Sequence, residues 1–175
     1  SGKYNLSQLA INFLNPYYDR QEHPWPVFPC RLNNPSDVHG RHMLVDALNK
    51  GDYDILFIIN DTYVTDGVVE ELKKYQQARE QAGFKRVKVI YYYPVDCRLW
   101  PESSNMVIYA DKKVAYTQFG IAETLRIYPH LKGQIDYVYH GADTTSYFKQ
   151  PDPIRMEKRR QLLHCGPESF VFINV

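Results

Sequence analysis

The chain has 175 residues and a mass of 20.6 kDa, which is enough for a domain with a proper hydrophobic core. Twenty-one Lys and Arg oppose twenty Asp and Glu, and this near-neutral balance argues against a nucleic-acid-binding protein, which carries a concentrated basic surface. No apolar run reaches the roughly 18 residues that span a bilayer. The three widely spaced cysteines fit neither a disulfide framework nor a zinc pattern, so a cytoplasmic location is expected.

The N-terminal third lacks a regular alternation of elements. Apolar residues at helical spacing predict a helix over residues 5–14, ended by Asn15 and Pro16. Five prolines between residues 16 and 35 exclude a long helix or a central strand. A second helix is predicted over residues 39–49, with Gly51 as its stop.

From Asp54 onward, strands and helices alternate. Short apolar runs predict strands at residues 54–59, 87–92, 113–117 and 135–139. Helices are predicted at residues 66–82, 101–110 and 118–128. The run at residues 54–59 is continuously apolar, as in a strand buried on both faces. Because each strand is followed by a helix, the pattern predicts right-handed βαβ units in a doubly wound α/β domain, with a parallel sheet covered on both faces.

The C-terminal part has a different pattern. After Gly141 a polar linker leads to a basic helix over residues 153–164 and an apolar strand over residues 169–175. A strand there needs neighbours outside the chain, and a doubly wound fold normally begins with a strand. We therefore expect a domain truncated at both ends, with a first domain over residues 1–140, an interdomain linker over 141–153, and the first helix and strand of a second domain over 154–175.

Polar residues follow each predicted strand. In open α/β sheets, ligands bind beyond the carboxyl ends of the strands. Those ends carry Asn60-Asp61-Thr62, Tyr93 to Asp96, Thr117-Gln118 and His140 to Asp143. The alternative is that these side chains only cap the helices and loops that follow them.

Other signatures of chemistry are missing or weak. The chain has no Walker A loop, no G-x-G-x-x-G and no G-x-S-x-G elbow. His39 and His42 share a helical spacing but lack a third ligand, so no metal is expected. The basic cluster at residues 155–160 either grips phosphate or forms a solvated helix face, and the second is the commoner case.

Three stretches together resemble a known family. Residues 135–143, followed by Tyr147-Phe148, resemble the interdomain segment of family 4 GT-B glycosyltransferases, in which a strand leads into a (His or Asn)-Gly-(Val or Ala)-Asp turn and then an aromatic residue. Residues 110–120 are similar to the segment in which an Asp precedes a strand ending in Ser or Thr. Residues 53–61 are similar to an earlier strand flanked by Asp.

The resemblance implies a retaining transfer of a sugar from a nucleotide-sugar donor to a carbohydrate or lipid-linked acceptor, with no metal or other cofactor. It implies a Rossmann-like, acceptor-side half of a GT-B enzyme, whose donor is held by a C-terminal domain beyond this chain. Transfer needs both halves closed over the reacting atoms, so the chain alone is expected to be inactive. No nucleic-acid partner is expected, and contact with a membrane surface is left open.

Site roles follow from the strand ends and from this resemblance. Asp96 is the candidate catalytic group, as a base or hydrogen-bond acceptor toward an acceptor hydroxyl. The expected acceptor-binding residues are Asp61, Thr62, Tyr93 (as a stacking face), Thr117 and Gln118. Ser1 and Gly2 match the donor-side loop, and the hinge residues are His140, Gly141 and Asp143.

One departure from the family pattern bears on the function. Many family members carry a His before the Asp at this position, whereas this chain has Pro94-Val95-Asp96. The competing hypothesis is therefore a non-catalytic α/β module that binds a glycan or a protein.

Overall fold

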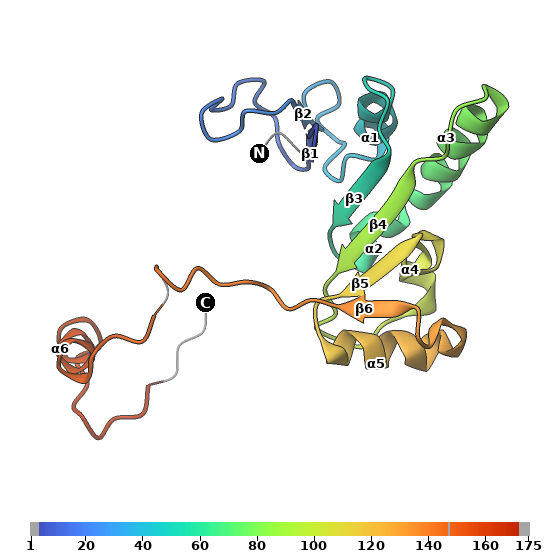
Figure 1. The fold of residues 1–175 in the computed structure, drawn as a ribbon. Coiled ribbons are helices and arrows are strands. Elements are labelled where there is room, and N and C mark those ends of the chain that lie inside the picture. The colour runs from blue at the N-terminus through green and yellow to red at the C-terminus, as the bar shows by residue number, and fades with distance from the viewer. Residues whose placement is uncertain (1–3, 147, 172–175) are drawn as a thin grey trace. The chain divides into compact units, whose positions relative to one another are not determined.

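The computed structural model describes residues 4–146 and 148–171, and the chain divides into two compact units, Ser1–Tyr139 and His140–Val175. The first unit contains a four-stranded sheet in which every neighbouring pair is parallel (Figure 1). Its strands, in spatial order, are β3 (Ile55–Ile59), β4 (Lys88–Tyr93), β5 (Lys112–Ala115) and β6 (Ile135–Tyr137). The four predicted parallel strands are confirmed, and the fold is α/β, compatible with a Rossmann-like domain.

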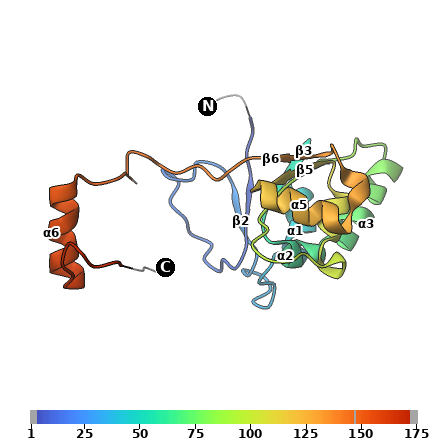
Figure 2. The same cartoon turned by 90° about the horizontal axis from the view of Figure 1, so that it is seen from below.

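The helices of this unit lie on one side of the sheet (Figure 2). They are α1 (Arg41–Leu48), α2 (Thr62–Asp66), α3 (Val69–Gln81), α4 (Asn105–Tyr109) and α5 (Gln118–Ile127), with 3-10 turns η1 (Pro101–Ser103) and η2 (Pro129–Leu131). The strands follow one another in space in chain order, so right-handed crossovers bring each connecting helix to the same face. The reversal of strand order that defines a doubly wound sheet does not occur among the described strands.

The core fills the space between this face and the helices. Alternate residues of β4, namely Val89, Tyr91 and Tyr93, have no exposed surface. They belong to one cluster with Leu72 of α3 and Met106 of α4, which are also fully buried. The alternation follows from the strand's period of two, which sends every second side chain to the same face.

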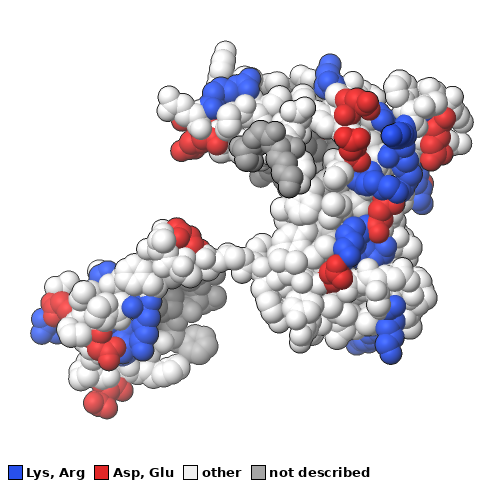
Figure 3. Space-filling model, in the orientation of Figure 1, with Lys and Arg blue, Asp and Glu red and all other residues white. Residues whose placement is uncertain are grey.

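The opposite face of the sheet is open, which corrects the expectation of burial on both faces. Ile55, Phe57 and Ile59 of β3 are 53–54% exposed. Their side chains point away from the helices because they alternate with Leu56 and Ile58. Figure 3 views this face and shows few charged side chains over the sheet, with Lys, Arg, Asp and Glu gathered toward the amino-terminal ends of the strands.

Two polar side chains hold the start of β4. The Gln76 amide of α3 donates to the carbonyl of Val87 (2.6 Å) and accepts from its N–H (3.0 Å). The Asp111 carboxylate, which precedes β5, accepts the N–H of Val89 (2.8 Å) and pairs with Arg86. These contacts satisfy backbone groups at the beginning of the strand, where the ladder is incomplete.

The N-terminal segment is not the predicted helix. Residues 8–10 form β1 (Gln8–Ala10), which pairs in parallel with β2 (Val27–Pro29) in a separate two-stranded sheet. Hydrogen bonding to β2 replaces the local bonds of a helix, and Asn12 has a left-handed φ of 51° that a helix cannot contain.

Two helix boundaries also differ from expectation. α1 begins at Arg41, two residues after the predicted start, and ends at Leu48, one residue before the predicted limit, with Asn49 as its C-cap. The helix predicted over residues 66–82 corresponds to α3, which begins at Val69 and ends at Gln81, while Asp66 is the last residue of α2. The Asp66 carboxylate accepts the N–H of Asn105 (2.8 Å).

The second unit contains α6 (Asp152–Leu163), which agrees with the helix expected over residues 153–164. Its Arg155 and Arg160 pair with Asp152 and Glu157 on the same helix, as on a solvated face. Ser169 to Val171 are not in a strand, and the rest of the strand predicted over 169–175 lies outside the described residues. In the described part of the chain, no helix has the length and apolar composition needed to cross a membrane.

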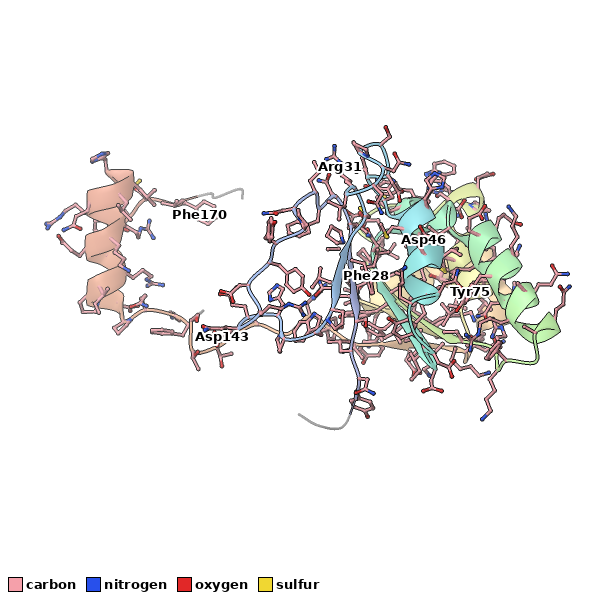
Figure 4. All side chains as sticks on the ribbon, turned by 90° about the horizontal axis from the view of Figure 1, so that it is seen from above. Phe28, Arg31, Asp46, Tyr75, Asp143 and Phe170 are labelled. Atoms are coloured by element: carbon pink, nitrogen blue, oxygen red, sulfur yellow. The ribbon has the colours of Figure 1, made fainter. Side chains whose placement is uncertain are left out.

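We predict that Asp37→Ala lowers the free energy of unfolding by about 1–3 kcal/mol. The buried Asp37 carboxylate accepts the first three N–H groups of α1, from Arg41 (2.7 Å), His42 (3.1 Å) and Met43 (3.1 Å). Urea unfolding measures the loss. The matched control is Asp46→Ala on the exposed face of the same helix (Figure 4), which should change stability by less than about 0.5 kcal/mol. Equal effects of the two variants would contradict the capping role.

We predict a pH-dependent contribution from Asp111. Burial acts to raise its pKa, but hydrogen bonds from Val89 and Arg86 outweigh burial and lower it below its usual value. A carboxylate whose pKa is lower in the folded state contributes its full stabilisation of the fold above the unfolded-state pKa of about 4. This contribution is lost as the pH falls through the folded-state pKa. Asp111→Asn should therefore cost about 1–2 kcal/mol at pH 7 and progressively less as the pH falls from about 4 toward about 2.

Denaturant unfolding across that pH range measures the difference. Asp136→Asn is the control because Asp136 pairs with Lys112 at an exposed site, where ion pairs are worth about 0–1 kcal/mol. A gap between wild type and Asp111→Asn that does not change with pH would refute the ionic role.

Candidate functional site

The carboxyl ends of β3, β4 and β5 lie along one edge of the sheet. The parallel register pairs Ile59 with Tyr92 and Tyr93 with Ala115, so the residues after each strand emerge side by side. This arrangement brings together the segments that carry Asp61, Asp96 and Thr117, as the strand-end rule predicts.

At the end of β3, a buried tyrosine holds the backbone that presents Asp61. The Tyr91 hydroxyl donates to the carbonyl of Asn60 (3.0 Å) and accepts from the Thr65 hydroxyl (2.8 Å). Asp61 begins α2 without a side-chain capping bond. Burial raises the pKa of Tyr91 and of Tyr116, and the negative charge of Asp61 raises both further. Thr62 is 8% exposed and presents little surface to a ligand.

At the end of β4, Asp96 is exposed beside Cys97. Local desolvation raises the pKa of the Cys97 thiol, and its contact with Asp96 and the charges of Asp61 and Glu123 raise it further. Three carboxylates from different segments thus act on one point of the sheet edge. Among the hydrogen bonds of residues 4–146 and 148–171, no backbone N–H donates to Asp96, so capping of the following loop does not explain this carboxylate.

At the end of β5, the two candidate residues have different surroundings. Thr117 is the N-cap of α5, and its hydroxyl accepts the N–H of Gly120 (3.1 Å), so the capping alternative holds for it. A Cβ on Gly120 would come within 3.1 Å of the Ala115 side chain, and the absent side chain allows α5 to approach β5 closely. Gln118 is exposed, and its amide donates to the Tyr137 hydroxyl (3.2 Å).

Tyr93 does not offer the stacking face expected of it. Its ring is fully buried and stacks on Tyr91 at a centroid distance of 5.0 Å. Its hydroxyl shares a hydrogen bond with Thr124 (3.0 Å), inside the core. The physical reason is parity along β4, because Tyr93 belongs to the alternate set of residues that faces the helices.

Aromatic residues that were not predicted from the sequence lie on the other side of the sheet. Tyr92 packs against Tyr116 at 4.2 Å between ring centroids and lies 6.5 Å from Phe57, while its hydroxyl donates to the carbonyl of Val138 (2.7 Å). The alternation of side chains along a strand could have identified Tyr92 from the sequence, since it places Tyr92 on the face of the sheet opposite Tyr93.

The hinge candidates belong to the second unit. Asp143 organises a local turn, in which its carboxylate accepts the N–H (2.9 Å) and hydroxyl (2.6 Å) of Thr145 and the hydroxyl of Ser146 (2.6 Å). The bonds from Ser146 and Thr145 lower the pKa of Asp143 to about 2. His140 and Gly141 are exposed before this turn. The donor-side candidates Ser1 and Gly2 lie outside the described residues.

Within residues 4–146 and 148–171, no cluster of three or more His, Cys, Asp or Glu is arranged to hold a metal ion. Compared with known proteins, the chain matches no protein-family model, no curated sequence and no solved structure. The site is therefore defined by its own geometry. Asp61, Asp96 and Gln118 present two carboxylates and one amide at the sheet edge, a set that can accept and donate hydrogen bonds to the hydroxyl groups of a ligand.

We predict that Tyr93→Phe lowers the free energy of unfolding by about 1 kcal/mol, since it removes the buried bond to Thr124. Thermal or urea unfolding measures the change. Tyr63→Phe is the control because Tyr63 is 63% exposed and should tolerate the same deletion without effect. If the two variants are equally stable, the internal role of the Tyr93 hydroxyl is refuted.

Proposed function

We propose that this chain is the acceptor-side domain of a retaining glycosyltransferase of the family 4, GT-B kind. The observation that carries the proposal is the segment from Ile135 to Asp143, in which a strand of the parallel sheet leads into a His-Gly-Ala-Asp turn. The Asp143 turn is consistent with an interdomain hinge, because it organises its own backbone locally. In this proposal the complete sheet is doubly wound, and a second domain binds the nucleotide-sugar.

The proposed acceptor is a carbohydrate or a lipid-linked sugar held at the carboxyl ends of β3, β4 and β5. Asp61 and Gln118 orient its hydroxyl groups, and Asp96 accepts the proton of the attacking hydroxyl. That oxygen bonds to the anomeric carbon of the donor as the bond between this carbon and the phosphate oxygen of the nucleotide breaks. The nucleotide leaves with the electron pair of that bond. No metal or other cofactor is part of the proposal.

The exposure of Asp96 supports its proposed role, because its carboxylate is accessible and has no capping duty. Thr117 and Tyr93 contribute to the scaffold of the site in this proposal, and Thr62 contributes through its backbone.

The test is Asp96→Asn in the full-length protein that carries this domain, assayed by transfer of labelled sugar from a panel of nucleotide-sugars. The variant keeps the size of the side chain and removes its charge, and we expect transfer to fall by at least about a hundredfold. Asp136→Asn makes the same change at an exposed position of β6, where the carboxylate pairs with Lys112, and should leave transfer unchanged. A loss below about threefold for Asp96→Asn, or roughly 0.7 kcal/mol in the barrier, would contradict a catalytic role.

A non-catalytic glycan- or protein-binding module is the second candidate. The observation in its favour is that the position before Asp96 holds Val95, which is buried, where many family members have a histidine. Binding of this 175-residue chain to immobilised glycans, together with absence of transfer by the full-length protein with every donor, would favour the module over the enzyme.

A further inference from the structure

The outer edge of β3 is a free sheet edge. β3 stands first in the order β3-β4-β5-β6 and pairs with no second strand among the described residues. An exposed edge strand presents unpaired N–H and C=O groups that can bind another strand.

The ladder identifies which backbone groups face outward. The N–H of Lys88 donates to the carbonyl of Asp54 (2.9 Å). This bond fits the register in which Ile55 of β3 is the partner of Lys88 of β4. In a parallel pair, alternate residues direct both of their backbone groups to the same neighbour. Leu56 and Ile58 therefore bond to β4. The groups of Ile55, Phe57 and Ile59 point to the free edge.

A groove runs along this edge. Its volume is about 490 Å³, and one wall is β3 itself, from Ile55 to Asn60. The other wall comes from residues 5–9, from Ile11 and from Phe28 of β2 (Figure 4), and Leu44 and Leu48 of α1 line it as well. Among the described residues that line it, none is Lys, Arg, Asp or Glu.

We propose that this groove binds an extended polypeptide strand with apolar side chains, which continues the sheet beyond β3. Three outward N–H groups and three outward C=O groups match the hydrogen-bonding pattern of an added strand. The uncharged lining excludes a charged segment, because an unpaired charge there would lose its hydration. Residues 5–9 and Ile11 line the groove together with β3, so an added strand would lie between them. The proposal does not depend on the proposed enzymatic function.

The test uses a capped seven-residue peptide of alternating valine and threonine with a lysine at each end, titrated into the 175-residue chain. The matched peptide carries N-methyl groups at alternate positions, which remove the donors of one edge. We expect the first peptide to bind at least tenfold more tightly than the second. Amide exchange of Ile55, Phe57 and Ile59 should slow at least tenfold on binding, while that of Leu56 and Ile58 stays unchanged.

Two variants test the edge from the protein side. Phe57→Pro removes an outward N–H that β4 does not use, and proline is tolerated on edge strands. Phe57→Ala removes the same side chain and keeps the N–H. We expect Phe57→Pro to bind the peptide about tenfold more weakly than Phe57→Ala.

If Phe57→Pro fails to fold, the two peptides on the wild-type chain still decide the question. Equal affinity of the two peptides, unchanged exchange at Ile55, Phe57 and Ile59, or a dimer that forms through β3 without peptide would each overturn the proposal.

Discussion

The parallel ladder that joins β3, β4, β5 and β6 in chain order is the constraint on which the rest of the structure depends. Right-handed crossovers between successive neighbours bring the connecting helices to one face, so this face holds the core. The same parallel direction brings the residues after β3, β4 and β5 to one edge. The proposed acceptor site, the buried tyrosines and the open apolar face are therefore three consequences of one topology.

The strands were predictable because each is a short apolar run with breaking residues on both sides. The coverage of the sheet was not predictable for β3, since Ile55-Leu56-Phe57-Ile58-Ile59 is equally apolar at odd and even positions. Nothing in that run distinguishes a covered face from an open one. The segment around Leu9 was misassigned because its apolar spacing fits a helix, while its pairing with β2 depends on residues almost twenty positions away.

The location of the site at the carboxyl ends of the strands was predictable, whereas the role of each single side chain was less so. Asp61 and Asp96 follow their strands in loops, where exposure is the rule. Tyr93 is the last residue of β4, and only its parity with Val89 and Tyr91 decides that it points into the core. Thr117 matched both a ligand contact and an N-cap, and the hydrogen bond from Gly120 assigns it to the second role.

The two polar contacts at the start of β4 have a consequence for folding specificity. A slip of one residue would exchange Val89, Tyr91 and Tyr93 in the core for Lys88, Ile90 and Tyr92. Hydrophobicity thus discriminates between the two alignments at the first position, where Lys88 would be buried, and weakly at the other two. Gln76 binds both backbone groups of Val87, and Asp111 binds the N–H of the second residue along, so two hydrophilic side chains select the native alignment of the most buried strand.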